Sequence, residues 1–241
     1  MISDALLDAL AQAISNSTQL PDFPAGITVA DAYQQLPELA KRVSGSPAGI
    51  KAGITNIELQ KLFGLEEALI GLLYKNRELQ SGDNLVYSPH RRIECEMAVT
   101  FNSDGTPIAV GPAIEFVSLD FARPEDMTPG NVTLCNLGAD QFIRGDMTDW
   151  DSFDFEALST LEIVAIRDGE TLLTTTPMDS LGGPKSAHKW CMAKAKALGY
   201  GFPEGGILLA GTNGSALTGE PGEYAIHFGN LGSIQFTITE S

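Results

Sequence analysis

The spacing of apolar residues predicts two amphipathic helices at the start of the chain. After a candidate cap at Ser3, apolar side chains recur at helical intervals, at Leu6, Leu7, Leu10 and Ile14. The same pattern returns over residues 28–43, behind a candidate cap at Thr28. Between the two, residues 16–26 hold two prolines and a glycine, which indicates a loop. Residues 1–45 are therefore expected to form a small helical N-terminal part.

From residue 46 onward the pattern changes to short apolar runs separated by glycine-containing turns, which is typical of β-strands. Strands are predicted at residues 93–102, 108–121, 161–176 (a pair turned at Asp168-Gly169), 207–212, 223–229 and 233–238. A short helix is predicted at 57–64, and a longer one begins at Pro184 and ends at Gly199. We therefore expect an α+β fold whose β-rich domain spans residues 46–241.

The charge of the chain excludes several classes of partner. It has 31 acidic and 15 basic residues, a formal net charge of −16. This charge repels phosphate backbones and anionic lipid, so neither nucleic acid nor membrane is an expected partner. The start of the chain lacks a basic signal region, and no apolar run is long enough to span a bilayer. Three scattered cysteines without CxxC spacing suit a reducing compartment, so we expect a cytoplasmic protein.

Two glutamates place charge in the otherwise apolar segment IECEMAV, residues 93–99. Side chains alternate along a strand, so Glu94 and Glu96 point to the same face. A third glutamate, Glu115, lies among apolar residues in the next predicted strand. Buried like charges destabilise each other unless a cation lies between them, and three carboxylates suit a hard ion, Mg²⁺ or Mn²⁺. The alternative is a solvent-exposed strand face, which an E-x-E pair alone indicates more often.

Six segments, in the same order along the chain, resemble motifs of the fumarylacetoacetate hydrolase superfamily, in its 2-keto-4-pentenoate hydratase and 4-oxalocrotonate decarboxylase branch. They are GIKAGIT (49–55), IECEMAV (93–99), PAIEFV (112–117), GGPKSAHKWCMAKAKALG (182–199), GGILLAGT (205–212) and FGNLGSI (228–234). The resemblance implies a mixed β-roll body like the fumarylacetoacetase C-terminal domain, and a homo-oligomer. It also implies a metal held by Glu94, Glu96 and Glu115, and a small-molecule 2-keto acid as substrate.

The resemblance extends to residues with roles in catalysis and substrate binding. Lys51 matches the branch's lysine and is the expected catalytic residue, either as a proton shuttle or as the group that holds the substrate carboxylate. We expect burial and a nearby cation to lower the pKa of Lys51. Thr55 and Thr212 are expected at the substrate, with Gly211 permitting close approach, although an ordinary turn is the alternative for the last two. In the implied chemistry the metal chelates the 2-oxo and carboxylate groups and stabilises an enolate or dienol.

The chain departs from the branch at three substrate-facing positions. Asn76 stands where the branch has an acidic residue, and Ser118 lies in a segment that replaces its D-S-R sequence. Asn136 lies in a segment that replaces its serine-rich N-A-S-S-G motif. Glu78 and Asp140 are candidates for the missing acid, but spacing alone cannot place either. The proton-transfer and specificity residues are thus altered while the metal ligands are kept.

We expect a divalent-metal-dependent lyase acting on a 2-keto-enoic acid, similar to a 2-keto-4-pentenoate hydratase, in the catabolism of aromatic compounds. A decarboxylase of a 4-oxalocrotonate-type 2-oxo-3-enedioate is one alternative. A non-catalytic homologue that binds metal and a keto acid is another, and Asn76 and Ser118 motivate it. An acylpyruvate hydrolase is disfavoured because the sequence contains no His-x-x-Glu pair. Surface or core roles are expected for the three histidines, His90, His188 and His227.

Overall fold

The computed structural model describes residues 2–240, which include five α-helices. These are α1 (Asp4–Asn16), α2 (Val29–Ser44), α3 (Ile57–Leu62), α4 (Pro129–Leu134) and α5 (Pro184–Ala197). The predicted caps of α1 and α2 are confirmed. The Ser3 side chain accepts a hydrogen bond from Leu6 N, and Thr28 forms a reciprocal capping box with Asp31. Both caps satisfy N–H groups that a first helical turn leaves unpaired, which explains where these helices begin.

Fourteen strands form two sheets within the described residues. The nine-stranded sheet has the order β2-β1-β11-β5-β6-β7-β3, with β12 beside β5 and β8 beside β6. Its strands are β1 (Pro47–Gly53), β2 (Leu69–Tyr74), β3 (Glu78–Leu79), β5 (Arg91–Phe101), β6 (Pro107–Ser118), β7 (Ala139–Arg144), β8 (Thr148–Asp149), β11 (Gly206–Leu209) and β12 (Leu217–Thr218). The five-stranded sheet contains, in spatial order, β10 (Glu170–Thr175), β9 (Ile163–Arg167), β13 (Gly222–Phe228), β14 (Ser233–Thr239) and β4 (Asn84–Val86).

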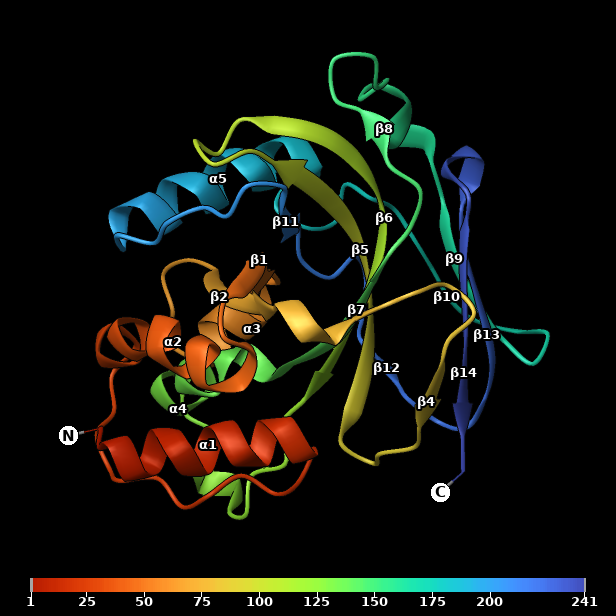
Figure 1. Cartoon of the computed structure of the whole chain (residues 1–241). Helices are drawn as coiled ribbons and strands as arrows, with labels where there is room; N and C mark the ends of the chain where they lie inside the picture. Colours follow the sequence, from red (N-terminus) through yellow and green to blue (C-terminus); the bar gives the residue numbers. More distant parts are fainter. Residues whose placement is uncertain (1, 241) are drawn as a thin grey trace.

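The larger sheet curls into an open half-barrel around the long antiparallel pair β5 and β6 (Figure 1). β2, at one end of the strand order, lies against β7 and the 3₁₀ turn η3 (Asn136–Gly138), which belong to the other end. The face that carries Glu94, Glu96 and Glu115 is called the inner face below. The outer face packs on the smaller sheet, where the rings of Phe116 and Phe236 meet edge to face with centroids 5.0 Å apart.

The N-terminal helices share the core of the strands. α2 packs against α1, α4 and β2, and Figure 1 shows α1 and α2 on the side of the half-barrel away from the smaller sheet. Buried side chains such as Leu10 and Leu36 belong to the same apolar cluster as Met97 and Phe116. The division of the chain at residue 45 stays a prediction. Within residues 2–240, none of the helices has the length and hydropathy needed to cross a bilayer.

The α+β class and the predicted strands are confirmed, including the turn at Asp168-Gly169, where both residues have positive φ. Seven strands and one helix were missing from the prediction: β1, β2, β3, β4, β7, β8, β12 and α4. β1 and β2 are continuous apolar or glycine-containing runs without the alternation that indicates a half-exposed strand. Missing β1 in the prediction matters because this strand carries Lys51 on the inner face.

Candidate metal centre

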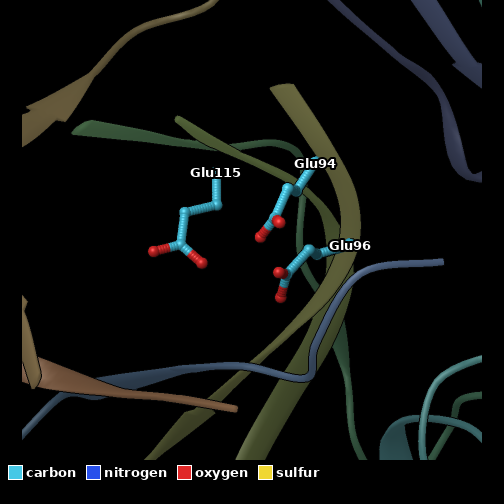
Figure 2. A group of neighbouring side chains, drawn as sticks. All are labelled: Glu94, Glu96 and Glu115. Atoms are coloured by element: carbon cyan, nitrogen blue, oxygen red, sulfur yellow. The ribbon is translucent and has the colours of Figure 1, made fainter. Parts of the chain in front are cut away.

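Strand alternation and register bring the three predicted glutamates together. Glu94 and Glu96 lie two residues apart on β5, and Glu115 is the direct cross-strand partner of Glu94 on β6. Ligand oxygen atoms of the three side chains all lie within 4.8 Å of one another. Figure 2 shows the three carboxylates gathered in one small space, with Glu94 and Glu96 projecting from the same strand. The predicted triad is therefore present as a spatial cluster.

The triad is buried and only partly compensated. Glu96 and Glu115 are fully buried, and Glu94 is half-buried. Among the described residues, Glu96 Oε1 and Glu115 Oε2 accept no hydrogen bond, while Glu96 Oε2 accepts one from Gly211 N at 2.7 Å. A buried carboxylate oxygen without a partner costs free energy, so this arrangement favours a ligand that supplies positive charge.

Burial and mutual repulsion shift the protonation of the triad in the metal-free chain. Burial, together with the charges of Glu115 and Glu94, raises the pKa of Glu96 well above its ordinary value. Burial also raises the pKa of Glu115, although the neighbouring Lys51 opposes the shift. A bound cation would reverse this effect, because a positive charge stabilises the ionised carboxylates. The site therefore favours either protons or a metal ion, and metal binding should release protons.

Lys51 reaches the triad from β1. Its register partners are Leu209 on β11 and Gly71 on β2, which place its side chain on the inner face. Lys51 is only 2% exposed. Its Nζ lies 2.8 Å from Glu115 Oε1 and donates a hydrogen bond of 3.0 Å to the carbonyl oxygen of Leu137. This lysine is thus the cationic neighbour of the three glutamates.

In the metal-free chain the pKa of Lys51 is shifted upward, and the lowering expected beside a bound cation stays a prediction. Burial does act to lower this pKa, but the charges of Glu115, Glu94 and Glu96 together outweigh burial and raise the pKa of Lys51 above its ordinary value. Sequence reasoning included a cation beside Lys51 but could not weigh three carboxylates against burial. Lys51 is therefore an ammonium group at neutral pH in this structure.

The turn after β11 lies directly beside Glu96. Gly211 has φ +95°, and a Cβ atom there would come within 2.4 Å of Ser180 Oγ and 2.6 Å of Thr55 Cγ2. Glycine is therefore needed both for the backbone conformation and for the close approach. Thr55 borders this turn, and the half-buried Thr212 follows Gly211. Contact of either threonine with a substrate stays a prediction.

Sequence reasoning missed three residues: Asn213 and Ser180, which support the turn, and Leu137, which supports the lysine. Asn213 fastens the turn to β5, because its Nδ2 donates to Cys95 O at 3.2 Å, and Ser180 Oγ donates to Ala210 O at 2.9 Å. Leu137, whose carbonyl oxygen accepts from Lys51, follows Asn136 in η3. No local pattern signals these contacts, because Lys51 and Leu137 are separated by 86 positions.

Two residues that differ from the branch, and the two candidates for the missing acid, lie outside the triad. The Asn76 side chain is exposed, and Ser118 is half-buried at the end of β6. Asp140 pairs with Arg77 and Arg91, each at 3.2 Å. The other candidate acid, Glu78, pairs with Arg144 at 3.0 Å. Neither candidate acid joins the triad.

The three histidines also lie outside the triad. His188 is buried, with Nε2 2.9 Å from Gly105 O, and burial lowers the pKa of its ring. His90 lies near Asp120 at 3.5 Å with a largely exposed ring, and His227 is exposed on β13. These positions agree with the core and surface roles expected for them.

The donor set fits a hard divalent cation. Among residues 2–240, Glu94, Glu96 and Glu115 form the one group of three or more acidic, histidine or cysteine side chains close enough to share an ion. All three donors are carboxylate oxygens, which Mg²⁺ and Mn²⁺ prefer over the nitrogen and sulfur donors typical of zinc sites. The inner face continues beyond them as a small apolar cluster of Leu73, Ala98, Ala113, Phe142, Ile207 and Leu209.

Comparison with known proteins agrees with this geometry. No family model matches the chain. A 2-keto-4-pentenoate hydratase of Burkholderia vietnamiensis is 26% identical over 234 residues, which cover 88% of this chain and 86% of that protein. A 4-oxalocrotonate decarboxylase of Pseudomonas putida G7, solved with magnesium and adipate, is similar in structure with a TM-score of 0.82 at 23% identity, covering 99% of both chains.

A more distant structure shares the fold. A fumarylpyruvate hydrolase of Pseudomonas aeruginosa, in complex with Mn²⁺ and pyruvate, has a TM-score of 0.56 at 10% identity, covering 80% of this chain and 89% of that one. The chain thus has the fold of the fumarylacetoacetate hydrolase superfamily, and its resemblance to the 2-keto-4-pentenoate hydratase and 4-oxalocrotonate decarboxylase branch is confirmed.

Proposed function

We propose that this protein is a divalent-metal-dependent lyase that hydrates a 2-keto-enoic acid in the catabolism of aromatic compounds. The observation that carries the proposal is the buried triad, whose negative charge exceeds the compensation from Lys51. The similarity to a 2-keto-4-pentenoate hydratase supports it, as do related structures that contain magnesium or Mn²⁺. Mg²⁺ or Mn²⁺ is the proposed cofactor, with Glu94, Glu96 and Glu115 as its ligands. A homo-oligomeric assembly stays a prediction.

The chemistry assigned to each residue follows from its position. A divalent cation at the triad would supply Lewis-acid stabilisation to the 2-oxo group of the substrate as an enolate forms. Lys51 presents an ammonium group beside Glu115, where it can hold the substrate carboxylate or move a proton at Nζ. The Gly211 N–H orients Glu96 by donating to Oε2. Thr55 and Thr212 are the proposed hydroxyl contacts to the substrate.

A decarboxylase of a 2-oxo-3-enedioate is the second candidate, favoured by the structural similarity to 4-oxalocrotonate decarboxylase. Both reactions generate an enolate next to the 2-oxo group, and they differ in whether water must be activated. A third candidate is a non-catalytic homologue that holds metal and a keto acid. It is favoured by the exposed Asn76 and by the pairing of Asp140 and Glu78 with arginines, which leaves the missing acid unreplaced.

The test measures the ultraviolet absorbance of two dienols with purified protein, first with Mg²⁺ and then with EDTA. The substrates are 2-hydroxypenta-2,4-dienoate and a 2-hydroxymuconate-type dienol. Metal-dependent loss of absorbance that disappears in a Glu96→Ala variant would support a lyase, and product analysis would separate hydration from decarboxylation. Metal binding without loss of either absorbance would instead favour the non-catalytic homologue.

A further inference from the structure

The Asn136 side chain links the edge strand β2 to the turn that precedes β7. β2 ends the strand order, so its outward N–H and C=O groups have no neighbouring strand. At Leu72 the Asn136 amide replaces that strand: Leu72 N donates to Asn136 Oδ1 at 2.7 Å, and Asn136 Nδ2 donates to Leu72 O at 2.6 Å. Asn136 lies in η3, directly before β7, so this pair of bonds ties one end of the curled sheet to the other.

The backbone around Asn136 has an unusual conformation that directs a carbonyl group toward Lys51. Asn136 and Leu137 both have φ 55°, and Gly138 has φ 72°. Asparagine tolerates the left-handed region, but a leucine there is strained, because its Cβ approaches the following carbonyl oxygen. The conformation persists because the surrounding contacts hold it. Its result is that Leu137 O accepts the hydrogen bond from Lys51 Nζ at 3.0 Å.

Close packing leaves Asn136 and Lys51 little freedom to move independently. A Cβ atom at Gly71 would come within 2.9 Å of Asn136 Oδ1 and 3.2 Å of Lys51 Cγ. On the other side, a Cβ atom at Gly53 would come within 2.7 Å of Leu137 Cδ1. Two glycines on the neighbouring strands thus admit η3 against the lysine. Displacing η3 would remove a hydrogen-bond partner of the Lys51 ammonium.

We propose that Asn136 is a positioning residue, which holds the Lys51 ammonium group beside the triad by joining β2 to η3. Asn136 is 1% exposed, and both ends of its amide are bound to Leu72, so it acts through the backbone rather than on a substrate. The functional part of this inference rests on the proposed metal-dependent function. Its structural part, the coupling of position 136 to position 51, does not.

The structural part is tested without metal by a double-mutant cycle between Asn136→Gly and Lys51→Met. Glycine keeps the left-handed conformation and removes the whole side chain, including the amide. We expect Asn136→Gly to raise the unfolding equilibrium constant at least about tenfold, since two buried hydrogen bonds are lost. It should also speed exchange of the Leu72 amide hydrogen. In the Lys51→Met background the effect on unfolding should be smaller by about threefold or more, because contacting residues couple. Equal effects in the two backgrounds would overturn the proposal.

The matched control is Asn102→Gly, in the turn between β5 and β6. The Asn102 side chain also makes two backbone hydrogen bonds, although both are accepted by Oδ1, from Asp104 N at 3.2 Å and Thr106 N at 3.0 Å. The control should lower stability without coupling to Lys51→Met. Coupling as large as that of Asn136 would overturn the proposal, because it would show that any loss of stability mimics the effect.

The functional part is tested by titrating the same variants with Mn²⁺ alone. Asn136→Gly should change the Mn²⁺ dissociation constant about threefold or more when Lys51 is present, and less than about twofold in the Lys51→Met background. An equal change in both backgrounds would overturn the positioning role at the metal centre. If the unmodified protein binds no Mn²⁺, the proposed function fails, whereas the unfolding cycle still decides whether Asn136 positions Lys51.

Discussion

Two buried groups of charged side chains in the structure, called the Asp140 cluster and the triad, have opposite charge balance. At Asp140, one carboxylate meets two guanidinium groups, those of Arg77 and Arg91, each at 3.2 Å. At the triad, three carboxylates meet one ammonium group, and Glu96 Oε1 and Glu115 Oε2 accept no hydrogen bond among the described residues. In the first cluster both oxygens of the carboxylate are paired with a guanidinium group, whereas the carboxylates of the second lack positive charge. Charge balance, rather than burial or acidity alone, therefore separates a structural ion pair from a candidate ligand site.

The position of each cluster reinforces the difference. Asp140 lies on β7 and links to Arg91 at the start of β5, and Arg77 also donates to the carbonyl oxygens of Ile14 and Ser15 at the end of α1. This network fastens the N-terminal helix to the half-barrel. The triad lies on the inner face beside a glycine turn, whose Gly211 N–H donates to Glu96. One cluster joins parts of the fold, and the other is suited to binding.

The largest expected effect comes from breaking the Asp140 cluster with Asp140→Ala. Removing this carboxylate leaves Arg77 and the buried Arg91 without their shared partner, so the free energy of unfolding should fall by about 3 kcal/mol. Chemical denaturation with and without Mn²⁺ would measure this loss. Stabilisation by Mn²⁺ should be retained in the variant. A loss below about 0.5 kcal/mol would show that Asp140 is not a structural ion pair.

Glu96→Gln should change stability and metal binding in the opposite way to Asp140→Ala. The substitution keeps the shape of the side chain and removes a buried, repelled charge, so the metal-free chain should become more stable. Mn²⁺ affinity should fall at least about a hundredfold, because a ligating carboxylate is lost. Isothermal titration calorimetry measures the affinity, and Asp140→Ala is the control. Unchanged Mn²⁺ affinity in Glu96→Gln would contradict the assignment of this ligand.

Lys51→Met should strengthen metal binding while it weakens turnover. The ammonium group lies 2.8 Å from Glu115 Oε1 and competes with a metal ion for the same carboxylate. Its removal should raise Mn²⁺ affinity by about tenfold, since like charges no longer repel. Calorimetry and the dienol assay would separate the two effects. Weaker Mn²⁺ binding in this variant would mean that Lys51 supports the metal site instead of competing for it.

The smallest effect is a dependence of metal-free stability on pH. The pKa of Glu115 is raised from 4.5 to about 7, so between these values the folded chain binds more protons than the unfolded chain. Its contribution to the free energy of unfolding should therefore fall as pH rises from 6 to 7, by about 1 kcal/mol. The difference between the unmodified protein and Glu115→Gln isolates this contribution, because His188 titrates in both.

Saturating Mg²⁺ should flatten this pH dependence, because a bound cation keeps Glu115 ionised in the folded chain. Denaturation curves at pH 5, 6 and 7, with and without Mg²⁺, would measure both effects. Without metal, the free energy of unfolding of the unmodified protein should fall with pH relative to that of Glu115→Gln. A rise instead would have the wrong sign for a raised carboxyl pKa.

Sequence reasoning located the triad from local patterns together with the resemblance to the branch, because an E-x-E pair alone indicates a solvent-exposed face more often. Alternation within IECEMAV placed Glu94 and Glu96 on one face, and the apolar residues around Glu115 indicated that it was inward. Helix starts at Ser3 and Thr28 were also predictable, because a cap acts within three residues. These features depend on neighbours in the chain, which a single sequence displays.

The rest of the site depends on contacts between distant segments. β2 is a uniformly buried run, LIGLLY, whose length and pattern fit several structures. The contact of Lys51 with Leu137 requires a left-handed leucine, which no local preference suggests. The direction of the Lys51 pKa shift required knowing that three carboxylates outweigh burial. Long-range geometry therefore decided what local patterns left open.

The most direct test of the central claim is a crystal structure with Mn²⁺, using anomalous diffraction to locate the ion. The account predicts one strong anomalous peak about 2.1 Å from carboxylate oxygens of Glu94, Glu96 and Glu115, a distance typical of a small octahedral cation. The Asp140 cluster should show no peak. Saturating Mn²⁺ with no peak at the triad, or a peak only elsewhere, would contradict the claim that the unbalanced cluster is a metal centre.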